Sequence, residues 1–392
     1  MREVVIVEAV RSPIGRRGGG LSTAHPVDVL SQIQQEVIRR SGIDPNEIGQ
    51  VVGGCVSQVG EQSFNVTRTA WLAAGLPLGT PSTTVDTQCG SSQQATNMAA
   101  SLIAAGVVDA ALGCGVESMS RIPIGSNSDK KLGLGRAVPK SYFANYEFTS
   151  QFEGAERLAD KYNITRQECD QLALSSQQRG ARAWKEDRFG NQIASITVPM
   201  LDEEGKPTGQ TTVISRDEGL RETTLEGLAT LKPVARPDGA HTAGSSSQIS
   251  DGSAAVLMME RSRAEALGLK PRARIVDSCL LGCDPVLMLT GPIEATQHLF
   301  SRTGLKMSNI DVVEINEAFA SVVVAWAREN DPDMEKVNPN GGAIALGHPL
   351  GGTGAILLTK ALHELERTDG QFGLITMCCG GGLGTGTIIE RL

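Results

Sequence analysis

Aromatic residues are scarce in this chain: 8 Phe, 3 Tyr and 3 Trp make up 4% of its 392 residues. Positive charge is also in the minority, since 36 Lys and Arg face 44 Asp and Glu, for a formal net charge of −8. A chain with this balance is not expected to bind nucleic acid or an anionic membrane surface. No apolar run reaches the ~18 residues of a membrane-spanning helix, so membrane insertion is not expected either.

The eight cysteines follow no zinc pattern. Cys279 and Cys283 form a CxxxC spacing, Cys378 and Cys379 are adjacent, and neither a His-x-His nor a second CxxC accompanies them. We therefore expect no metal site. The chain opens on MREVVIVEAV, which is typical of a strand and unlike a secretory leader, so we expect a cytoplasmic protein whose thiols stay reduced.

Glycine, in contrast, is abundant, with 45 residues against a usual share of ~7%. Short apolar strands alternate with amphipathic helices near both ends of the chain, which predicts an α/β fold. The segment VNPNGGAIALG (337–347) is expected to form one further strand followed by a turn. Something in this fold requires backbone without side chains.

The two ends of the chain share one order of elements, which predicts duplicated halves at residues 1–119 and 271–392. TQCGSSQQA places Cys89 at the end of an apolar strand, before a helix, and IALGHPLGGTGA places His348 at the corresponding turn of the second half. The two turns should meet at the interface between the halves.

Residues 120–249 have no counterpart in this duplication. A connector of that length is unlike an ordinary loop, so we expect an inserted lid or binding subdomain. Residues 250–270 are expected to return to the core of the first half.

Cys89 is a candidate nucleophile because free backbone N–H groups at a helix N-terminus lower a thiol pKa. Its alternative is a core position, like Cys55 or Cys114. His348 lies among glycines that let a ligand approach closely, and histidine is the natural base near neutral pH. His241, beside a serine-rich run, is not expected to take part.

A second thiol at the glycine-rich strand end TMCCGGG also indicates a site. Either Cys378 or Cys379 can point into it, because neighbours on a strand face opposite ways. A disulfide between these two neighbours would be geometrically strained. Asn316, in the run NEAF, can hold a water or a substrate carbonyl, and its alternative is a helix cap.

Cysteine, histidine, asparagine and a second cysteine are the residue types needed for acyl transfer through a thioester. Together CGSSQQA, NEAFA, NGGAIALGHPLGGTGA and the terminal CxGGG resemble the thiolases, acetyl-CoA acyltransferases, over essentially the whole chain. The resemblance implies two βαβαβαββ halves that form a layered α/β/α/β/α core. It also implies that the inserted loop subdomain binds coenzyme A.

The same resemblance implies a role for each residue. Cys89 is expected to be acylated, His348 to activate it, and Cys378 to act as acid and base at the α-carbon of acetyl-CoA. Asn316 would hold a water that forms one oxyanion hole with His348. The N–H groups of Cys89 and Gly380 would form the other, where losing one donor typically costs ~10²–10³ in rate.

The resemblance further implies contacts with coenzyme A. Ser247 matches a serine that contacts the pantetheine arm, and Arg221 and Thr223, in GLRETT, would lie on the nucleotide side. Met288 would line the thioester tunnel. Gln151 stands near the position where thiolases of short chains often carry His-Met-Gly or Met-Gly.

The run SQFEGAE that contains Gln151 resembles the thiolases of actinobacterial steroid degradation. It favours a bulky 3-oxoacyl-CoA over acetoacetyl-CoA. We therefore expect a degradative 3-ketoacyl-CoA thiolase that forms a homodimer or homotetramer. It would need no cofactor, because coenzyme A is a substrate.

Three alternatives are a biosynthetic acetoacetyl-CoA thiolase, a ketosynthase-like condensing enzyme and a non-enzymatic lipid carrier. The biosynthetic enzyme shares every catalytic residue. Cys378 argues against the condensing enzyme, and the four intact motifs argue against the carrier.

Overall fold

The computed structural model describes residues 2–129, 131, 133 and 135–392, so Met1 of the first expected strand lies outside the described residues. One large sheet runs in the order β10-β11-β12-β9-β1-β8-β5-β3-β4, with β2 (Gly15–Arg16) beside β8. Its strands are β1 (Val4–Arg11), β3 (Gln50–Gly54), β4 (Ser82–Val85), β5 (Ala110–Ser118), β8 (Ser250–Glu260), β9 (Ala273–Gly282), β10 (Val312–Ile315), β11 (Phe372–Cys379) and β12 (Leu383–Arg391).

Strand order and direction repeat between the halves, which confirms the predicted duplication. The order β3-β5-β8-β1 of the first half matches β10-β11-β12-β9 of the second. In each half the first pair is parallel and the next two pairs are antiparallel. The halves join where β1 pairs with β9 over Val5–Arg274 and Ile6–Ala273.

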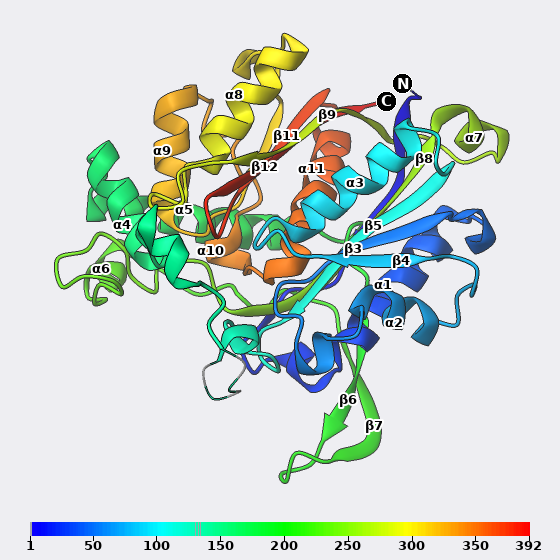
Figure 1. Ribbon diagram of the computed structural model, residues 1–392, viewed down its shortest axis with the longest axis horizontal. Helices are drawn as coiled ribbons and strands as arrows, with labels where there is room; N and C mark the ends of the chain where they lie inside the picture. The colour runs from blue at the N-terminus through cyan, green and yellow to red at the C-terminus, as the bar shows by residue number, and fades with distance from the viewer. Residues whose placement is uncertain (1, 130, 132, 134) are drawn as a thin grey trace.

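The helices make three layers around the two halves of the sheet, as the resemblance implied (Figure 1). α3 (Ser91–Ala104) and α11 (Thr353–Thr368) pack against each other between the sheet halves. One outer layer contains α1 (Pro26–Ser41) and α2 (Val66–Ala73), and the other contains α8 (Gly291–Thr303) and α9 (Ala320–Asn330). The short α7 (Arg261–Ala266) follows β8.

Glycine at the start of α11 lets the two central helices touch. A Cβ on Gly354 would lie 2.3 Å from the backbone nitrogen of Gln93 in α3. A Cβ on Gly115 of β5 would lie 2.3 Å from the carbonyl oxygen of Gly351. Since Cβ atoms do not approach other heavy atoms this closely, these positions exclude every larger residue.

The expectation of a strand at the start of residues 337–347 is wrong. Only Val337 makes a bridge, parallel to Val313, at the place that β4 occupies in the first half. The chain then turns at Gly341, whose φ is +79°, and packs so closely on α5 that a Cβ there would lie 2.8 Å from Ser176 O. It continues into the short helix α10 (Ala343–Leu346), so the glycines turn the backbone away from the sheet.

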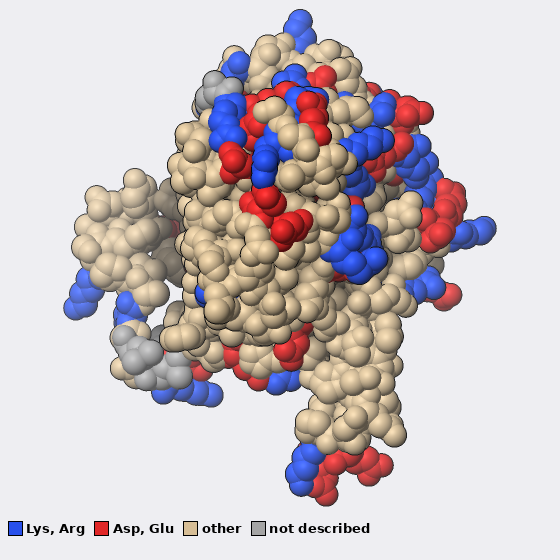
Figure 2. Space-filling view, turned by 90° about the vertical axis from the view of Figure 1, so that its right-hand side faces the viewer, with Lys and Arg blue, Asp and Glu red and all other residues tan. Residues whose placement is uncertain are grey.

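The segment between β5 and β8 covers one side of this core. It contains α4 (Gln151–Tyr162), α5 (Arg166–Lys185), α6 (Leu225–Ala229) and a hairpin of β6 (Ile196–Leu201) and β7 (Pro207–Ile214). α4 and α5 both pack on α9, and α5 also packs on α10. The hairpin projects as an arm whose charged side chains gather at its tip (Figure 2).

We predict that Gly354→Ala lowers the free energy of unfolding by about 1–3 kcal/mol, the usual cost of overpacking a core. Urea denaturation of the two proteins measures the difference. Gly79→Ala is the matched control, because nothing lies within 4 Å of a Cβ at Gly79 and its φ is not positive. Equal losses in both variants would contradict the close approach of α3 and α11.

Candidate active site

Cys89 lies in a sharp turn between β4 and α3 and is 4% exposed. The strand ends four residues earlier, at Val85, so the expectation that Cys89 itself ends the strand is wrong. Gln88 has a φ of +50°, which is uncommon for a residue other than glycine. The carboxylate of Asp86 stabilises this conformation by accepting a hydrogen bond of 2.7 Å from Gln88 N–H.

Burial raises the pKa of the Cys89 thiol to about 11. Hydrogen bonds from the N–H groups of Gly380 and Cys89 and from the side chain of Gln151 act in the opposite direction. The predicted lowering of this pKa is therefore wrong, because desolvation outweighs the helix N-terminus. The N–H groups of Cys89 and Gly380 nevertheless lie at the sulfur, and their role in an oxyanion hole stays a prediction.

His348 is 3% exposed and its hydrogen bonds define its tautomer. Thr353 Oγ1 lies 2.6 Å from Nδ1 and donates its own proton to Pro349 O at 2.9 Å. Since that proton is used, Oγ1 accepts from Nδ1–H and leaves Nε2 as the free acceptor. Burial lowers the pKa of His348 to about 4, so the ring is neutral at pH 7.

Asn316 lies against this free nitrogen. Its Nδ2 is 3.3 Å from His348 Nε2, while its buried Oδ1 makes no hydrogen bond within the described residues. A buried acceptor without a partner is costly, so Oδ1 is suited to a water that donates to it. The helix-cap alternative does not apply, because Phe319 is the N-cap of α9.

Two buried carboxylates hold the loops of the site. Glu317, which follows Asn316, accepts hydrogen bonds from Ser176, Asn338 and Ile344 N–H just before the His348 turn. The other carboxylate is Glu117 of β5. It accepts from the N–H groups at 56, 57 and 351 and from the side chain of residue 62. The apolar run GCGVES could have revealed Glu117 from the sequence, because a carboxylate in a buried strand needs hydrogen-bond donors around it.

The two neighbouring thiols at the end of β11 point to different sides. Cys378 packs in the apolar cluster that contains Met288 and Phe319, whereas Cys379 packs with Cys89 and the central helices. A Cβ on Gly90 would lie 2.6 Å from Cys379 Sγ, so that thiol is enclosed by the turn after Cys89. All eight cysteines are described and all are free thiols.

Burial raises the pKa of Cys378 well above its usual range, and the next cause is the nearby Cys89 thiol. Cys379 shows the same direction with the same two leading causes. Both thiols therefore lie close to Cys89. Only Cys378 also faces the apolar cluster of Met288 and Phe319.

Three of the expected substrate contacts lie on segments that flank the site. The Gln151 side chain bonds the Cys89 sulfur, and its Nε2 lies 3.0 Å from the position of a Cβ on Gly380. Met288 is buried, with Cβ 3.5 Å from a Cβ position on Gly154 of α4. Ser247 donates its N–H to Ala318 O at 2.9 Å, two residues beyond Asn316.

Arg221 and Thr223 lie further out, on a surface cavity of about 420 Å³. Gln177, Leu228 and Gly244 line the same cavity. Gly244 is three residues from Ser247, so this cavity and the inner site share one segment of chain.

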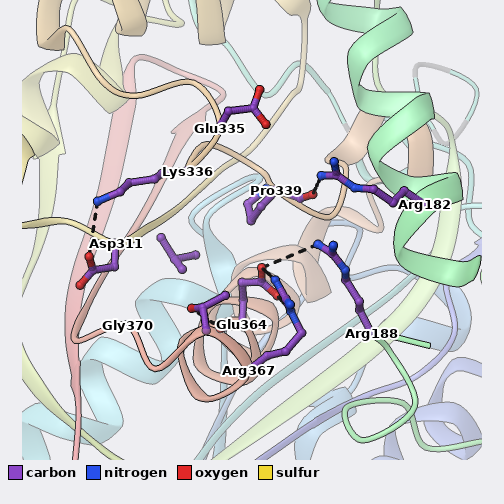
Figure 3. A pocket seen from close by; sticks show the side chains of 11 residues that line it. Arg182, Arg188, Asp311, Glu335, Lys336, Pro339, Glu364, Arg367 and Gly370 are labelled. Atoms are coloured by element: carbon purple, nitrogen blue, oxygen red, sulfur yellow. Dashed lines mark hydrogen bonds and ion pairs between the residues drawn. The ribbon is translucent and has the colours of Figure 1, made fainter. Parts of the chain in front are cut away.

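Another cavity of about 420 Å³ contains none of the candidate site residues (Figure 3). Its charged walls pair with one another: Arg367 with Glu364 at 2.7 Å and Lys336 with Asp311 at 3.4 Å. In the part of the chain that the structure describes, no group of three or more His, Cys, Asp or Glu residues could hold a metal ion.

Two family models match nearly the whole chain: the thiolase N-terminal domain over residues 4–262 and the thiolase C-terminal domain over residues 269–391. The chain belongs to the thiolase family. This enzyme is therefore an acyltransferase by family, which agrees with two thiols and an imidazole gathered in a buried site.

Relatives of known name resemble this thiolase along its full length. It is 45% identical to a steroid 3-ketoacyl-CoA thiolase of Mycobacterium tuberculosis, over 100% of this chain and 95% of that protein. It is 40% identical to a 3-ketoacyl-CoA thiolase of Bacillus subtilis, over 100% of both.

Solved structures of thiolases also match this chain along its full length. The acetyl-CoA acetyltransferase of Bacillus anthracis matches with a TM-score of 0.91 and 38% identity, over 100% of this chain and 99% of that one. Human mitochondrial 3-ketoacyl-CoA thiolase matches with a TM-score of 0.88 and 34% identity, over the same shares.

The lowered pKa of His348 predicts an effect of pH on stability. Between pH 6.5 and pH 4 the unfolded chain binds a proton at this ring that the folded protein excludes, so stability present above pH 6.5 is lost as pH falls toward 4. A shift from 6.5 to about 4 corresponds to about 3 kcal/mol. We expect His348→Asn to remove that share of the acid-induced loss, measured by urea denaturation at pH 7 and pH 4.5.

The same substitution at His298, on α8, is the control for this measurement. If the wild type and His348→Asn lose the same stability between the two pH values, the imidazole is not held neutral by burial.

Proposed function

We propose that this thiolase is a degradative 3-ketoacyl-CoA thiolase. It uses coenzyme A to cleave a 3-oxoacyl-CoA into acetyl-CoA and a shortened acyl-CoA. The observation that carries the proposal is that the Gly380 N–H and the Cys378 thiol lie near the Cys89 sulfur, just before α3, while a neutral His348 lies just before α11, the helix packed against α3. The names of the relatives support the same reaction.

In the first step His348 Nε2 takes the Cys89 thiol proton as the sulfur attacks the 3-oxo carbonyl. The oxyanion accepts hydrogen bonds from the N–H groups of Cys89 and Gly380, whose position at the sulfur supports this role. The carbon–carbon bond then breaks, and its electron pair passes to the α-carbon of acetyl-CoA.

The departing enolate needs donors and a proton. The enolate oxygen accepts from the His348 Nε2–H and from a water on Asn316 Oδ1, which has no other partner among the described residues. The Cys378 thiol protonates the α-carbon and becomes a thiolate. Its position in the apolar cluster with Met288 keeps bulk water away from the carbanion.

In the second step the Cys378 thiolate takes the proton of the incoming coenzyme A thiol. The resulting thiolate attacks acyl-Cys89, the acyl–sulfur bond breaks, and His348 returns its proton to Cys89. Coenzyme A is thus a substrate, and the cycle requires no cofactor.

We also propose that residues 120–249 bind coenzyme A. Ser247 would contact the pantetheine arm, and Arg221 and Thr223 would contact the nucleotide across the outer cavity that they line. Gln151 and Met288 would contact the thioester end. The halves at 1–119 with 250–270, and at 271–392, would supply the catalytic turns.

A bulky acyl group, such as a steroid side chain, is the proposed substrate class. A group of aromatic rings supports it: Tyr142 contacts Phe143, Tyr146 and Phe148 just before α4 begins at Gln151. Phe143, Tyr146 and Phe148 are exposed, in a chain with few aromatic residues. The relative from Mycobacterium tuberculosis, named for a steroid substrate, gives further support.

We propose a cytoplasmic homodimer or homotetramer. β4 lies at one end of the sheet order, so its outer edge is a place where a second copy can pair. No helix in the described part of the chain is long and apolar enough to cross a membrane.

Cys89 is expected to carry the acyl adduct after incubation with a 3-oxoacyl-CoA, as located by peptide mass spectrometry. Cys378→Ala should still form this adduct but lose exchange of the α-proton of acetyl-CoA with deuterated water by about 10²-fold or more, as expected for a general acid–base group. Cys283→Ala is the control. An adduct on Cys379, or exchange that survives in Cys378→Ala, would refute these roles.

The substrate proposal predicts a ranking of kcat/KM in the direction of thiolysis. A steroid-side-chain 3-oxoacyl-CoA should exceed acetoacetyl-CoA by about tenfold or more, equivalent to ~1.4 kcal/mol of extra binding in the transition state. Phe143→Ala should reduce the rate with the steroid substrate and leave acetoacetyl-CoA unchanged. A preference for acetoacetyl-CoA would instead favour a biosynthetic acetyltransferase, the activity in the name of the Bacillus anthracis relative.

A further inference from the structure

A buried histidine outside the catalytic turns connects three segments of the protein. His241 Nε2 lies 2.9 Å from Ser321 Oγ, and its Nδ1 lies 3.2 Å from Glu156 Oε1, close enough for charge pairing but without hydrogen-bond geometry. Glu156 is 2% exposed, and the histidine and the serine are fully buried. The contacts run from serine to histidine to glutamate, which is the order of side chains in the catalytic triad of serine hydrolases.

This trio is not built to hydrolyse a substrate. Ser321 Oγ also lies 3.3 Å from Ala155 O, and no part of Ser321 reaches the surface. A nucleophile must reach its substrate, which this hydroxyl does not. The trio must therefore act through the segments that it connects.

The first of these segments is α4. Glu156 accepts hydrogen bonds from Ala240 N–H at 2.8 Å and from His241 N–H at 3.1 Å. A Cβ on Gly239 would lie 2.5 Å from Glu156 Oε1, so the backbone approaches the carboxylate closely. The helix whose first residue, Gln151, bonds the Cys89 sulfur is thus fixed to the segment that leads to Ser247.

The second connection runs to the chain after Asn316. Ala320 N–H donates to Ser245 O at 3.0 Å, and Ser247 N–H donates to Ala318 O at 2.9 Å. The ring of Phe319 lies between the rings of His241 and Phe152, at 5.5 Å and 5.4 Å. His241 therefore packs against Phe319, which lies between the two residues whose backbone bonds the segment of Ser247.

We propose that Glu156, His241 and Ser321 are positioning residues for the pantetheine end of coenzyme A. They hold the segment 240–247 against α4 and the start of α9, so that Ser247 stands at a fixed distance from Cys89. This inference rests on the proposed function, in which Ser247 contacts pantetheine. It adds that the affinity for coenzyme A is set by a buried trio that does not touch the ligand.

Ser321→Ala tests the inference with little risk to folding, because alanine is favourable inside a helix. It removes the 2.9 Å partner of His241 Nε2 and leaves only the weak contact with Cys169 Sγ at 3.9 Å, and a poorly satisfied buried polar group is costly. We expect the Kd of coenzyme A, measured by calorimetry, to rise about tenfold, and KM to rise with it. The kcat at saturation and the rate of alkylation of Cys89 by iodoacetamide should stay within about twofold. The substitution weakens the binding of coenzyme A equally in the ground state and the transition state, which raises KM without changing kcat.

Ser321→Thr keeps the hydroxyl and should restore most of the affinity. Ser31→Ala is the matched control, because Ser31 is also buried in a helix and its hydroxyl bonds a backbone carbonyl, that of Asp28. His241→Gln provides a second test of the trio, with the same rise in Kd expected.

An unchanged Kd in Ser321→Ala and His241→Gln would overturn the inference, as would a fall in kcat with no change in KM. Equal effects in Ser31→Ala would show a general loss of stability instead and would also overturn it. The proposed function fails separately, if the wild type does not cleave any 3-oxoacyl-CoA, since calorimetry with coenzyme A needs no turnover.

Discussion

The contact between the first turns of α3 and α11 is the constraint on which the rest of the molecule depends. Gly354 brings its backbone against Gln93, and each helix is preceded by a turn that presents one reactive side chain, Cys89 or His348. A side chain at this contact would push the two turns apart. Because each turn belongs to a different half, the site exists only where the duplicated units meet.

Enclosure of this site determines the protonation of the groups within it. Burial raises the pKa of Cys89 to about 11 and lowers that of His348 to about 4, so both are neutral at pH 7. Moving the proton from sulfur to nitrogen is unfavourable until a substrate carbonyl is present to take up the charge. The donors at the sulfur, with the Gly380 N–H among them, then stabilise the oxygen that becomes negative.

The duplication and the α/β class were predictable, because alternating apolar strands and helices are local signals, and the layered core followed from the resemblance to thiolases. The candidate reactive side chains were found from the residues at strand–helix turns, and their roles remain predictions. The strand expected at 337–347 was not there, since Gly341 packs on α5, a contact remote in sequence. The thiol pKa of Cys89 was predicted in the wrong direction, because the depth of burial depends on α4, β11 and α11 together. His241 was dismissed for the same reason: its partners, Glu156 and Ser321, are about 80 residues away on either side.

Glu117 bonds backbone groups in both halves, so it affects how the two halves fold together. Its carboxylate, at the end of β5 in the first half, binds Gly351 N–H in the second half as well as Val56 and Ser57 N–H in its own. Burial raises its pKa, so it tolerates enclosure only with these donors in place. A nascent first half would therefore hold an incompletely satisfied carboxylate until Gly351 has left the ribosome. The turn of the second half around Gly351 thus completes both the core of the first half and the pocket beside it.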